Sequence, residues 1–185
     1  SQLIPAALTG YAELDLVRRS VRWVTDGPDT SLPNAARVLA GHIPDNPFII
    51  YRKRTGDAGA VRLSDLTTAR TFRETALYRE FYRPLHVQHS MACALRLDQR
   101  ELAAIALYRM GSDFSERDRL CLDLLRPHLV NLRRNAEAIA NAERQGHEYY
   151  QAWYEHATDP DLKETMRIVA NRELEHLSLI HISEP

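Results

Sequence analysis

The sequence has little cysteine, no long apolar run and almost no net charge, and each scarcity excludes a class of protein. Its 185 residues include two cysteines, Cys93 and Cys121, too few for a disulfide framework or a cysteine-rich zinc site. Reduced thiols and a cytoplasmic location are therefore expected. No run of about 18 apolar residues occurs, so we expect no transmembrane helix and no membrane partner. Basic and acidic side chains nearly cancel, 24 against 25, which argues against a broadly basic nucleic-acid binder.

Both ends of the sequence are unusual. The chain opens at Ser1, without a methionine or a basic segment ahead of an apolar core, which indicates a fragment or processed product without a signal peptide. Residues 177–185 keep an apolar content but lose the helical pattern, and they resemble translated sequencing-adapter read-through. We therefore expect a non-native tail there, and a natural protein that continued with further helices.

The first part of the chain alternates β-rich runs with helical patterns, and a hydrophobic fraction of 44% is enough for a full core. Antiparallel strands flanked by helices predict an α+β domain over residues 1–112. The expected elements are a hairpin at Tyr11–Leu16 and Val21–Thr25, a helix at Pro33–His42, short helices within Ser64–Tyr82, and strands at Val87–Leu95 and Glu101–Leu107.

The last two strands and the helices before them supply the candidate core. His89 and Cys93 share a strand face with apolar neighbours, so His89 is expected to be a satisfied core histidine and Cys93 a small buried hydrophobe with no cation beside it. A mainly aromatic cluster could form part of the core or line a ligand pocket, and the sequence favours the core. Its members are Phe72, Leu77, Tyr78, Phe81 and Tyr82.

A long helix is predicted after this domain. Ser115 and Asp118 have the spacing of a capping box, which places the start of the helix there. Pro127 is expected to kink or split the helix. The predicted apolar stripe consists of Leu120, Leu124, Leu125, Leu129 and Leu132.

Four segments together resemble the GAF-like sensor region of LuxR-type bacterial transcriptional regulators. They are residues 57–65 (DAGAVRLSD), 77–85 (LYREFYRPL), 113–118 (DFSERD) and 124–129 (LLRPHL). The resemblance covers roughly residues 10–135. It implies a cytoplasmic module with a central antiparallel sheet that binds an unknown small-molecule signal.

The C-terminal part departs from that family. A LuxR-type regulator would place a basic recognition helix near its end. Residues 161–177 instead carry four acidic against three basic side chains, which leaves no basic face for phosphates. We therefore expect a sensory module without its DNA-binding domain and no direct DNA binding by this chain.

Two amphipathic helices joined at residues 158–160 carry the only candidate metal ligands. Inner stripes are predicted at Leu132, Ala136, Ile139, Glu143, Gly146, Tyr150, Trp153 and Ala157, and at Leu162, Met166, Val169, Glu173, His176 and Ile180. Glu143, Glu173 and His176 thus occupy positions otherwise given mainly to apolar residues. A buried carboxylate needs a partner, a proton or a metal. The competing interpretation is a solvated helix face.

Residues 138–178 resemble the first helical pair of a ferritin-like or rubrerythrin-like protein, with Glu-x-x-His at residues 173–176 and a facing Glu143. The resemblance implies half of a di-iron or di-manganese site. The other half would come from a homodimer through the C-terminal helices, or is missing. This metal-binding module fused to a sensor is the alternative function.

The expected organisation is a GAF-like sensor domain at 1–112, a connecting helix at 113–142, a helical hairpin at 143–176 and the tail at 177–185. No Ser-His-Asp or Cys-His arrangement stands out, so no catalytic residue and no enzymatic activity are predicted.

Overall fold

The structure of the protein is a computed structural model that describes residues 3–26, 32 and 34–180, with side chains up to residue 172. The chain divides into two compact units, Ser1–Val130 and Asn131–Pro185. The long helix α5 (Glu116–His156) contributes residues to both units.

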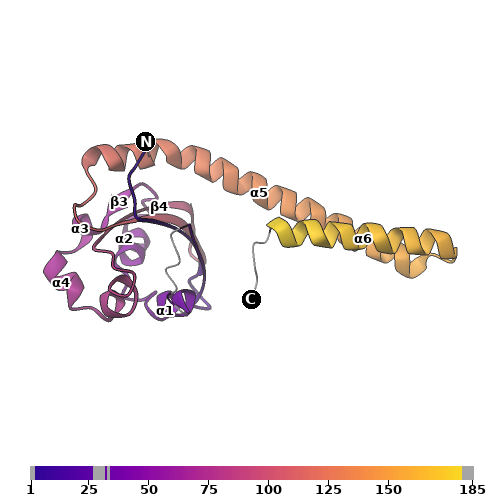
Figure 1. The fold of residues 1–185 in the computed structure, drawn as a ribbon, viewed down its shortest axis with the longest axis horizontal. Helices are drawn as coiled ribbons and strands as arrows, with labels where there is room; N and C mark the ends of the chain where they lie inside the picture. The colour runs from indigo at the N-terminus through magenta and orange to yellow at the C-terminus, as the bar shows by residue number, and fades with distance from the viewer. Residues whose placement is uncertain (1–2, 27–31, 33, 181–185) are drawn as a thin grey trace. The chain divides into compact units, whose positions relative to one another are not determined.

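An antiparallel five-stranded sheet forms the centre of the first unit (Figure 1). The strand order is β2-β1-β5-β4-β3. The strands are β1 (Leu8–Asp15), β2 (Ser20–Thr25), β3 (Val61–Arg62), β4 (His89–Leu97) and β5 (Glu101–Arg109). The predicted hairpin is confirmed by the pairing of Leu14 with Val21, and the second predicted pair by that of Met91 with Leu107. The predicted α+β class is therefore correct.

Alternation along the strands divides the side chains between two faces of the sheet. Met91, Cys93 and Leu107 belong to one core cluster, together with Phe114 and Leu122. The residues between them in the strands belong to two clusters that include the helices after β2. The sheet is thus covered on both faces.

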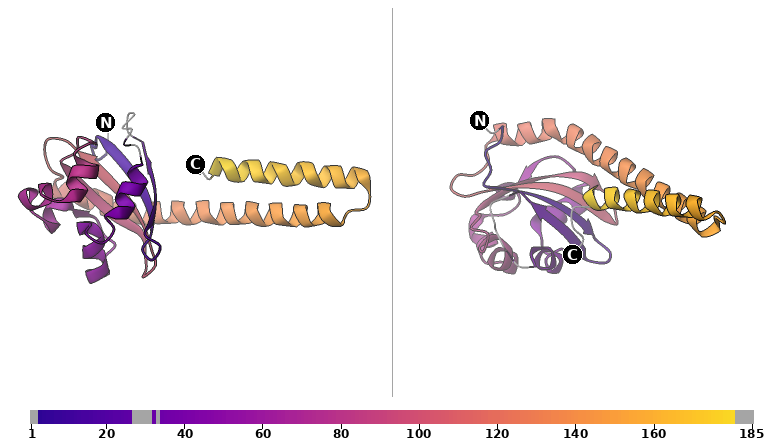
Figure 2. Two further views of the ribbon diagram at one scale, coloured as in Figure 1. Left: turned by 90° about the horizontal axis from the view of Figure 1, so that it is seen from below. Right: turned by 45° about the vertical axis from the view of Figure 1, so that its right-hand side comes forward.

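Short helices cover one face, as Figures 1 and 2 show for α1, α2 and α4, while the first turns of α5 lie across the other. They are α1 (Ala35–Gly41), α2 (Pro47–Thr55), α3 (Leu63–Leu66), α4 (Ala69–Arg73) and the π-helix η1 (Tyr78–Tyr82). The sequence patterns missed α2. Asn46 caps it by accepting a hydrogen bond from the Phe48 amide at 3.0 Å, and Pro47 occupies its first turn.

Helix α5 begins as predicted but packs through other residues. Ser115 Oγ accepts from the Asp118 amide and Asp118 Oδ2 accepts from the Ser115 amide, which confirms the capping box. The helix runs unbroken through Pro127, so the predicted split is wrong. The predicted stripe is partly wrong, since Leu124 and Leu132 are 74% and 66% exposed. Leu122 is buried instead, because α5 packs against the sheet through residues one or two positions away from the predicted stripe.

The second unit consists of the rest of α5 and helix α6 (Pro160–Ile180), which confirms the helical hairpin. The predicted inner stripe holds in part. Its half-buried members are Glu143, Gly146, Tyr150, Ala157, Met166 and Val169, whereas Leu132, Ala136, Ile139, Trp153 and Leu162 are exposed. The closest approach uses small residues, because Ala140 and Ala170 are the buried side chains among the described residues of this unit. His147 Nδ1 lies 2.8 Å from the carbonyl oxygen of Ala170 and links the two helices.

Among the described residues, no helix combines the length and the apolar content that a membrane span requires.

Candidate ligand-binding site

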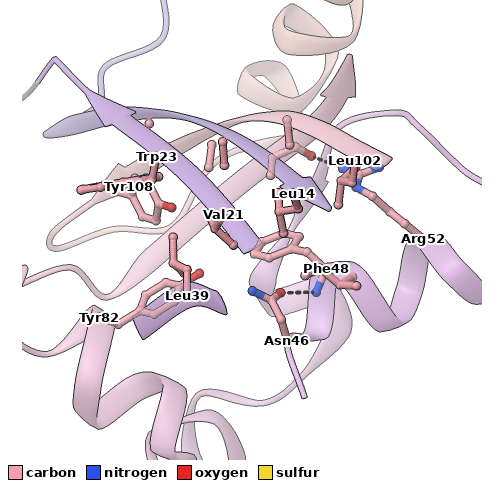
Figure 3. Close-up of a pocket in the computed structure, with 16 residues that line it drawn as sticks. Leu14, Val21, Trp23, Leu39, Asn46, Phe48, Arg52, Tyr82, Leu102 and Tyr108 are labelled. Atoms are coloured by element: carbon pink, nitrogen blue, oxygen red, sulfur yellow. Dashed lines mark hydrogen bonds between the residues drawn. The ribbon is translucent and has the colours of Figure 1, made fainter. Parts of the chain in front are cut away.

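A cavity of about 70 Å³ lies between the sheet and the helices that cover it (Figure 3). The sheet and the helices both contribute to its wall, and the helix side chains Leu39, Phe48 and Tyr82 face the strands across it. The described residues that line it are Gly10, Ala12, Leu14, Val21, Trp23, Leu39, Asn46, Phe48, Ile49, Arg52, Tyr82, Ala92, Leu102, Ala104, Ala106 and Tyr108.

The cavity exists because three adjacent strands present very small side chains to it. In the sheet register Ala106 of β5 lies between Gly10 of β1 and Ala92 of β4, and Ala12 lies opposite Ala104. Protein interiors are otherwise filled to the density of organic crystals. A patch of glycine and alanine under large helix side chains therefore leaves space that no neighbour fills.

Aromatic side chains form one end of the cavity. Trp23 and Tyr108 lie next to one another in Figure 3, and the ring centroids of Tyr82 and Tyr108 are 5.9 Å apart. The Tyr82 hydroxyl lies 3.2 Å from that of Ser90, and burial raises the pKa of Tyr82 to about 12. Burial also raises the pKa of Tyr108 well above its usual value. Both hydroxyls therefore remain protonated at neutral pH.

Trp23 presents an unused polar group at this end. Its indole N–H is buried and has no hydrogen-bond partner among the described residues. The Tyr108 hydroxyl is the nearby acceptor for this N–H, because interaction with the indole lowers the pKa of Tyr108 against the rise caused by burial, although the geometry falls outside that of a regular hydrogen bond. A buried donor without a partner costs roughly 1–3 kcal/mol.

Gly10 makes room for this indole. A Cβ atom at position 10 would lie 2.8 Å from Trp23 Nε1 and 3.2 Å from Tyr108 Cε2. Glycine inside a strand often marks the close approach of another group. The absence of a side chain at position 10 is therefore part of the shape of the cavity.

A buried arginine forms the other end. Arg52 is 2% exposed, and its two terminal nitrogens donate to the carbonyl oxygens of Asp57, Gly59 and Ala92 at 2.8–3.2 Å. Burial lowers the pKa of its guanidinium, which nearby negative groups only partly offset. No carboxylate within the described part of the chain forms an ion pair with it. The wall therefore carries a positive charge that is held mainly by carbonyl oxygens, with the Asp57 carboxylate acting on it through space.

Arg52 also donates a hydrogen bond to a backbone carbonyl group at the β4 edge of the sheet. Strand β3 has two residues and covers β4 only as far as Ala92. Beyond it, Arg52 donates to the Ala92 carbonyl, and Arg126 of α5 donates through Nε to the Ala94 carbonyl at 2.7 Å. Exposed strand edges need such partners.

The aromatic cluster predicted between residues 72 and 82 proves to be mainly core. Phe72, Leu77 and Phe81 are buried in one cluster, and Tyr82 is the member that also lines the cavity. The sequence patterns did not identify Trp23, Arg52, or the glycine and alanines of the strands that line the cavity. The signal that could have found them is the pair of small residues Gly10 and Ala12 on the strand next to Trp23, which pairs with Ala12 and reaches over Gly10.

The prediction that Cys93 is buried is confirmed, whereas that for His89 holds only in part, because its side chain is hydrogen-bonded but partly exposed and does not belong to the core. His89 Nε2 lies 2.9 Å from the Gly111 carbonyl oxygen, so the histidine is satisfied. Cys93 is completely buried, and burial raises the pKa of its thiol to about 11. The expectation of no nearby cation is wrong, because Arg52 and Arg126 partly offset that rise.

The candidate metal ligands are only partly described. Glu143 has one carboxylate oxygen, Oε2, that is buried without a hydrogen-bond partner among the described residues. The side chains of Glu173 and His176 lie outside the described part, and within that part no three His, Cys, Asp or Glu residues converge on one point. The iron or manganese site therefore stays a prediction.

A wider, open groove lies on the opposite face of the sheet, with a volume of about 550 Å³. It runs between the start of the chain, β1, β5 and α5, and Leu122, Leu125 and Leu129 form one side. No buried unpaired polar atom lines it within the described residues. We therefore take the cavity between the sheet and the short helices as the candidate site.

Comparison with known proteins supports the fold. No family model matches the sequence, and no curated protein matches it. Among solved structures, the VqsR LBD domain from Pseudomonas aeruginosa aligns with a TM-score of 0.55 at 18% identity, over 69% of this chain and 75% of that one. Its fold is shared by this chain.

Two weaker likenesses are to SdiA, and neither assigns a fold. Escherichia coli SdiA aligns with a TM-score of 0.43 at 16% identity, over 95% of this chain and 77% of that one. SdiA in complex with octanoyl-rac-glycerol gives 0.45 at 13% identity, over 95% and 74%.

Proposed function

We propose that residues 1–130 form the small-molecule-binding sensor domain of a cytoplasmic bacterial LuxR-type transcriptional regulator. The observation that carries this proposal is the cavity between sheet and helices, whose mainly apolar lining includes a few polar groups such as the Arg52 guanidinium and the Tyr82 hydroxyl. Concave, mostly apolar pockets with a few placed polar groups are typical of small-molecule sites. The fold shared with the VqsR LBD domain and the motifs at 57–65 and 113–118 support the regulator family.

The size of the cavity limits what the present state can hold. A cavity of about 150 Å³ is known to hold benzene, whereas this one has about 70 Å³. A molecule of a few heavy atoms fits as the walls stand. A larger signal requires the helix side, which includes the π-helix η1, to move away from the sheet.

Strand β4 offers a physical link from the cavity to α5. Arg52, in the cavity wall, binds the Ala92 carbonyl, and Arg126, on α5, binds the Ala94 carbonyl of the same strand. Asp123 of α5 also accepts from the Ala60 amide at 2.6 Å, ahead of β3. A ligand that shifts β4 would bias α5 if its affinity differs between the two arrangements. Residues 161–177 carry four acidic against three basic side chains and so present no basic recognition face, and we propose that this chain does not itself bind DNA.

The test is binding of small apolar probes to the full chain, followed by methyl NMR. Cyclopentane and butanone are expected to shift the methyl signals of Leu102, Ala104 and Ala106 with saturation. In an Ala104→Leu variant, whose added carbons occupy the cavity, these shifts should disappear. Ala138→Leu, at an exposed position of α5, is the matched control. Probe shifts that persist unchanged in Ala104→Leu, or none in the wild type, would contradict the proposed function.

A further inference from the structure

We propose that the π-helix η1 is the gate of the cavity, and that it opens by changing from its present register to an α-helical register, which turns the Tyr82 side chain out of the wall. The inference rests on the proposed function, because it assigns the moving part of the same cavity. Among the described residues of η1, Tyr82 is the one that lines the cavity. Its withdrawal would add the volume of a phenol ring beside Tyr108.

Two backbone hydrogen bonds characterise the present register. The Arg83 amide donates to the Tyr78 carbonyl at 2.8 Å, and the Val87 amide donates to the Tyr82 carbonyl at 3.1 Å. Each bond spans five residues, one more than in an α-helical turn. Because the wider turn holds an extra residue, the consecutive side chains of Phe81 and Tyr82 are both buried in the cluster that includes the sheet.

The sequence of this segment also carries the pattern of an α-helix. Leu77, Phe81 and Leu85 are buried at a spacing of four residues, which is the apolar stripe of an α-helix. Tyr82 lies outside that stripe. Successive side chains of an α-helix point roughly 100° apart, so in the α-helical register Phe81 would keep its place in the core while Tyr82 turns away from the sheet.

Pro84 holds the segment in the wider register. In an α-helical register its ring would meet the carbonyl group of Glu80, and it has no N–H to donate to that group. The extra residue continues into the loop before β4, where His86 adopts a φ of +55°, a left-handed conformation that residues other than glycine rarely take. Such conformations gather at ligand clamps and switch regions, and a change of register would release this one.

Two side-chain contacts add to the hold on η1. On the cavity side, the Tyr82 hydroxyl lies 3.2 Å from that of Ser90. On the outer side, Glu80 Oε2 lies 3.1 Å from Nε2 of His42, which follows α1. The Glu80 side chain is more than half exposed, and contacts of exposed charged groups contribute little to stability. A ligand that gains apolar contact only in the enlarged cavity can therefore offset the loss of both.

Naphthalene tests the gate, because it is larger than the benzene that a cavity of about 150 Å³ holds, and this cavity has about 70 Å³. The full chain is labelled with 3-fluorotyrosine, and Tyr82→Phe assigns the fluorine signal of Tyr82. A soluble gadolinium chelate is expected to broaden this signal when naphthalene is bound. The signal should stay sharp without a probe and with cyclopentane, which leaves the gate closed.

Pro84→Ala removes the obstacle to the α-helical register. The variant should bind naphthalene about tenfold more tightly, because apparent affinity rises with the populated fraction of the competent state. Its affinity for cyclopentane should not increase. Pro47→Ala is the matched control, since Pro47 occupies the first turn of α2, where proline suits a helix, and naphthalene should bind this variant as it binds the wild type.

Three results would overturn the gate and leave the proposed function standing. They are naphthalene binding with the Tyr82 signal still protected, no naphthalene binding although cyclopentane and butanone bind, and equal naphthalene affinity in Pro84→Ala and the wild type. The gadolinium measurement is made on the wild type, so it decides the matter even if the Pro84 variant does not fold. Absence of binding by every probe would remove the proposed function as well.

Discussion

At the scale of single residues, the cavity depends on side chains that are absent as much as on those that are present. Gly10 and four alanines create the space, while Trp23 and Arg52 give its two ends their polarity. Each of these residues sits in a strand or helix whose formation does not require it. Their identities can therefore be changed one at a time to test what the cavity contributes.

Gly10→Ala is expected to close the space beside the indole. The new methyl group would lie 2.8 Å from Trp23 Nε1, so the ring or the strand must shift, at a cost of about 1–3 kcal/mol. Thermal denaturation should show a lower melting temperature, and butanone should no longer bind. Gly41→Ala is the control, because a Cβ there meets nothing within 4 Å and alanine suits a helix better. A variant at position 10 as stable as the wild type and still binding butanone would contradict this account of the cavity.

Arg52→Met should destabilise the first unit strongly. The methionine can fill the buried volume, but it leaves the carbonyl oxygens of Asp57, Gly59 and Ala92 without their donor. Each buried carbonyl left without a donor costs about 1–3 kcal/mol, so we expect a loss of roughly 3 kcal/mol or more in the free energy of unfolding, measured by urea denaturation. Arg54→Met, on the exposed face of the same helix, should change it by less than about 0.5 kcal/mol. A small effect at position 52 would mean that water replaces the guanidinium.

Cys93 should be inert to thiol reagents in the native state. Its folded pKa is raised to about 11 from an ordinary 9.0, so the thiol stays protonated at pH 8 and is also completely buried. The proton stabilises the fold below pH 9.0, and that contribution is lost as the pH rises from 9.0 towards 11. Labelling with a disulfide reagent at pH 8 should modify the partly exposed Cys121 and reach Cys93 only in denaturant. A Cys121→Ser variant that still labels rapidly would overturn this.

At the scale of elements, local sequence patterns predicted where helices and strands begin and end. They did not predict which face of a helix packs against its neighbours. The capping box at Ser115 and Asp118 and the hairpin of β1 and β2 were predictable, because each depends on residues a few positions apart. The packing stripe of α5 was partly mispredicted, since Leu124 is exposed and Leu122 is buried. Several apolar residues occur on adjacent positions of this helix, so periodicity alone permits more than one stripe.

The anchoring of α5 to β4 gives a prediction at this scale. Arg126→Leu removes the hydrogen bond to the Ala94 carbonyl while keeping apolar volume on the helix. Amide hydrogen exchange across residues 116–130 is expected to accelerate by about tenfold, which corresponds to roughly 1.4 kcal/mol of local stability. Arg117→Leu, an exposed position on the first turns, should leave exchange unchanged. Equal exchange in both variants would show that Asp123 and the apolar contacts hold the helix without Arg126.

At the scale of the whole molecule, the two units differ in how much they bury. The first has clusters on both faces of its sheet. In the described part of the second, only Ala140 and Ala170 are buried, and Ile139, Trp153 and Ile168 are exposed. Helical stability in proteins comes mostly from packing of an apolar face, so two helices with little buried between them have little to resist opening.

Amide hydrogen exchange measured on the full chain should therefore be faster in the second unit than in the first. Amides of residues 131–172 are expected to exchange at least about 100-fold faster than those of β4 and β5 in the same sample, because local opening there exposes little apolar surface. The ratio should persist when the protein is diluted tenfold. Protection of the hairpin equal to that of the sheet, and lost on dilution, would show that a second copy covers the exposed apolar residues.

Local patterns in the chain were enough to predict the order and type of most elements and the helical hairpin of the second unit. These follow from alternation, capping residues and turn residues that act over a few positions. The cavity depends on long-range packing, because Gly10, Ala92 and Ala106 come from three strands and become neighbours only through the sheet register. The same packing leaves the Trp23 indole unpaired among the described residues and buries Arg52. Whether a polar atom has a partner depends on residues distant in the chain, which no local pattern records.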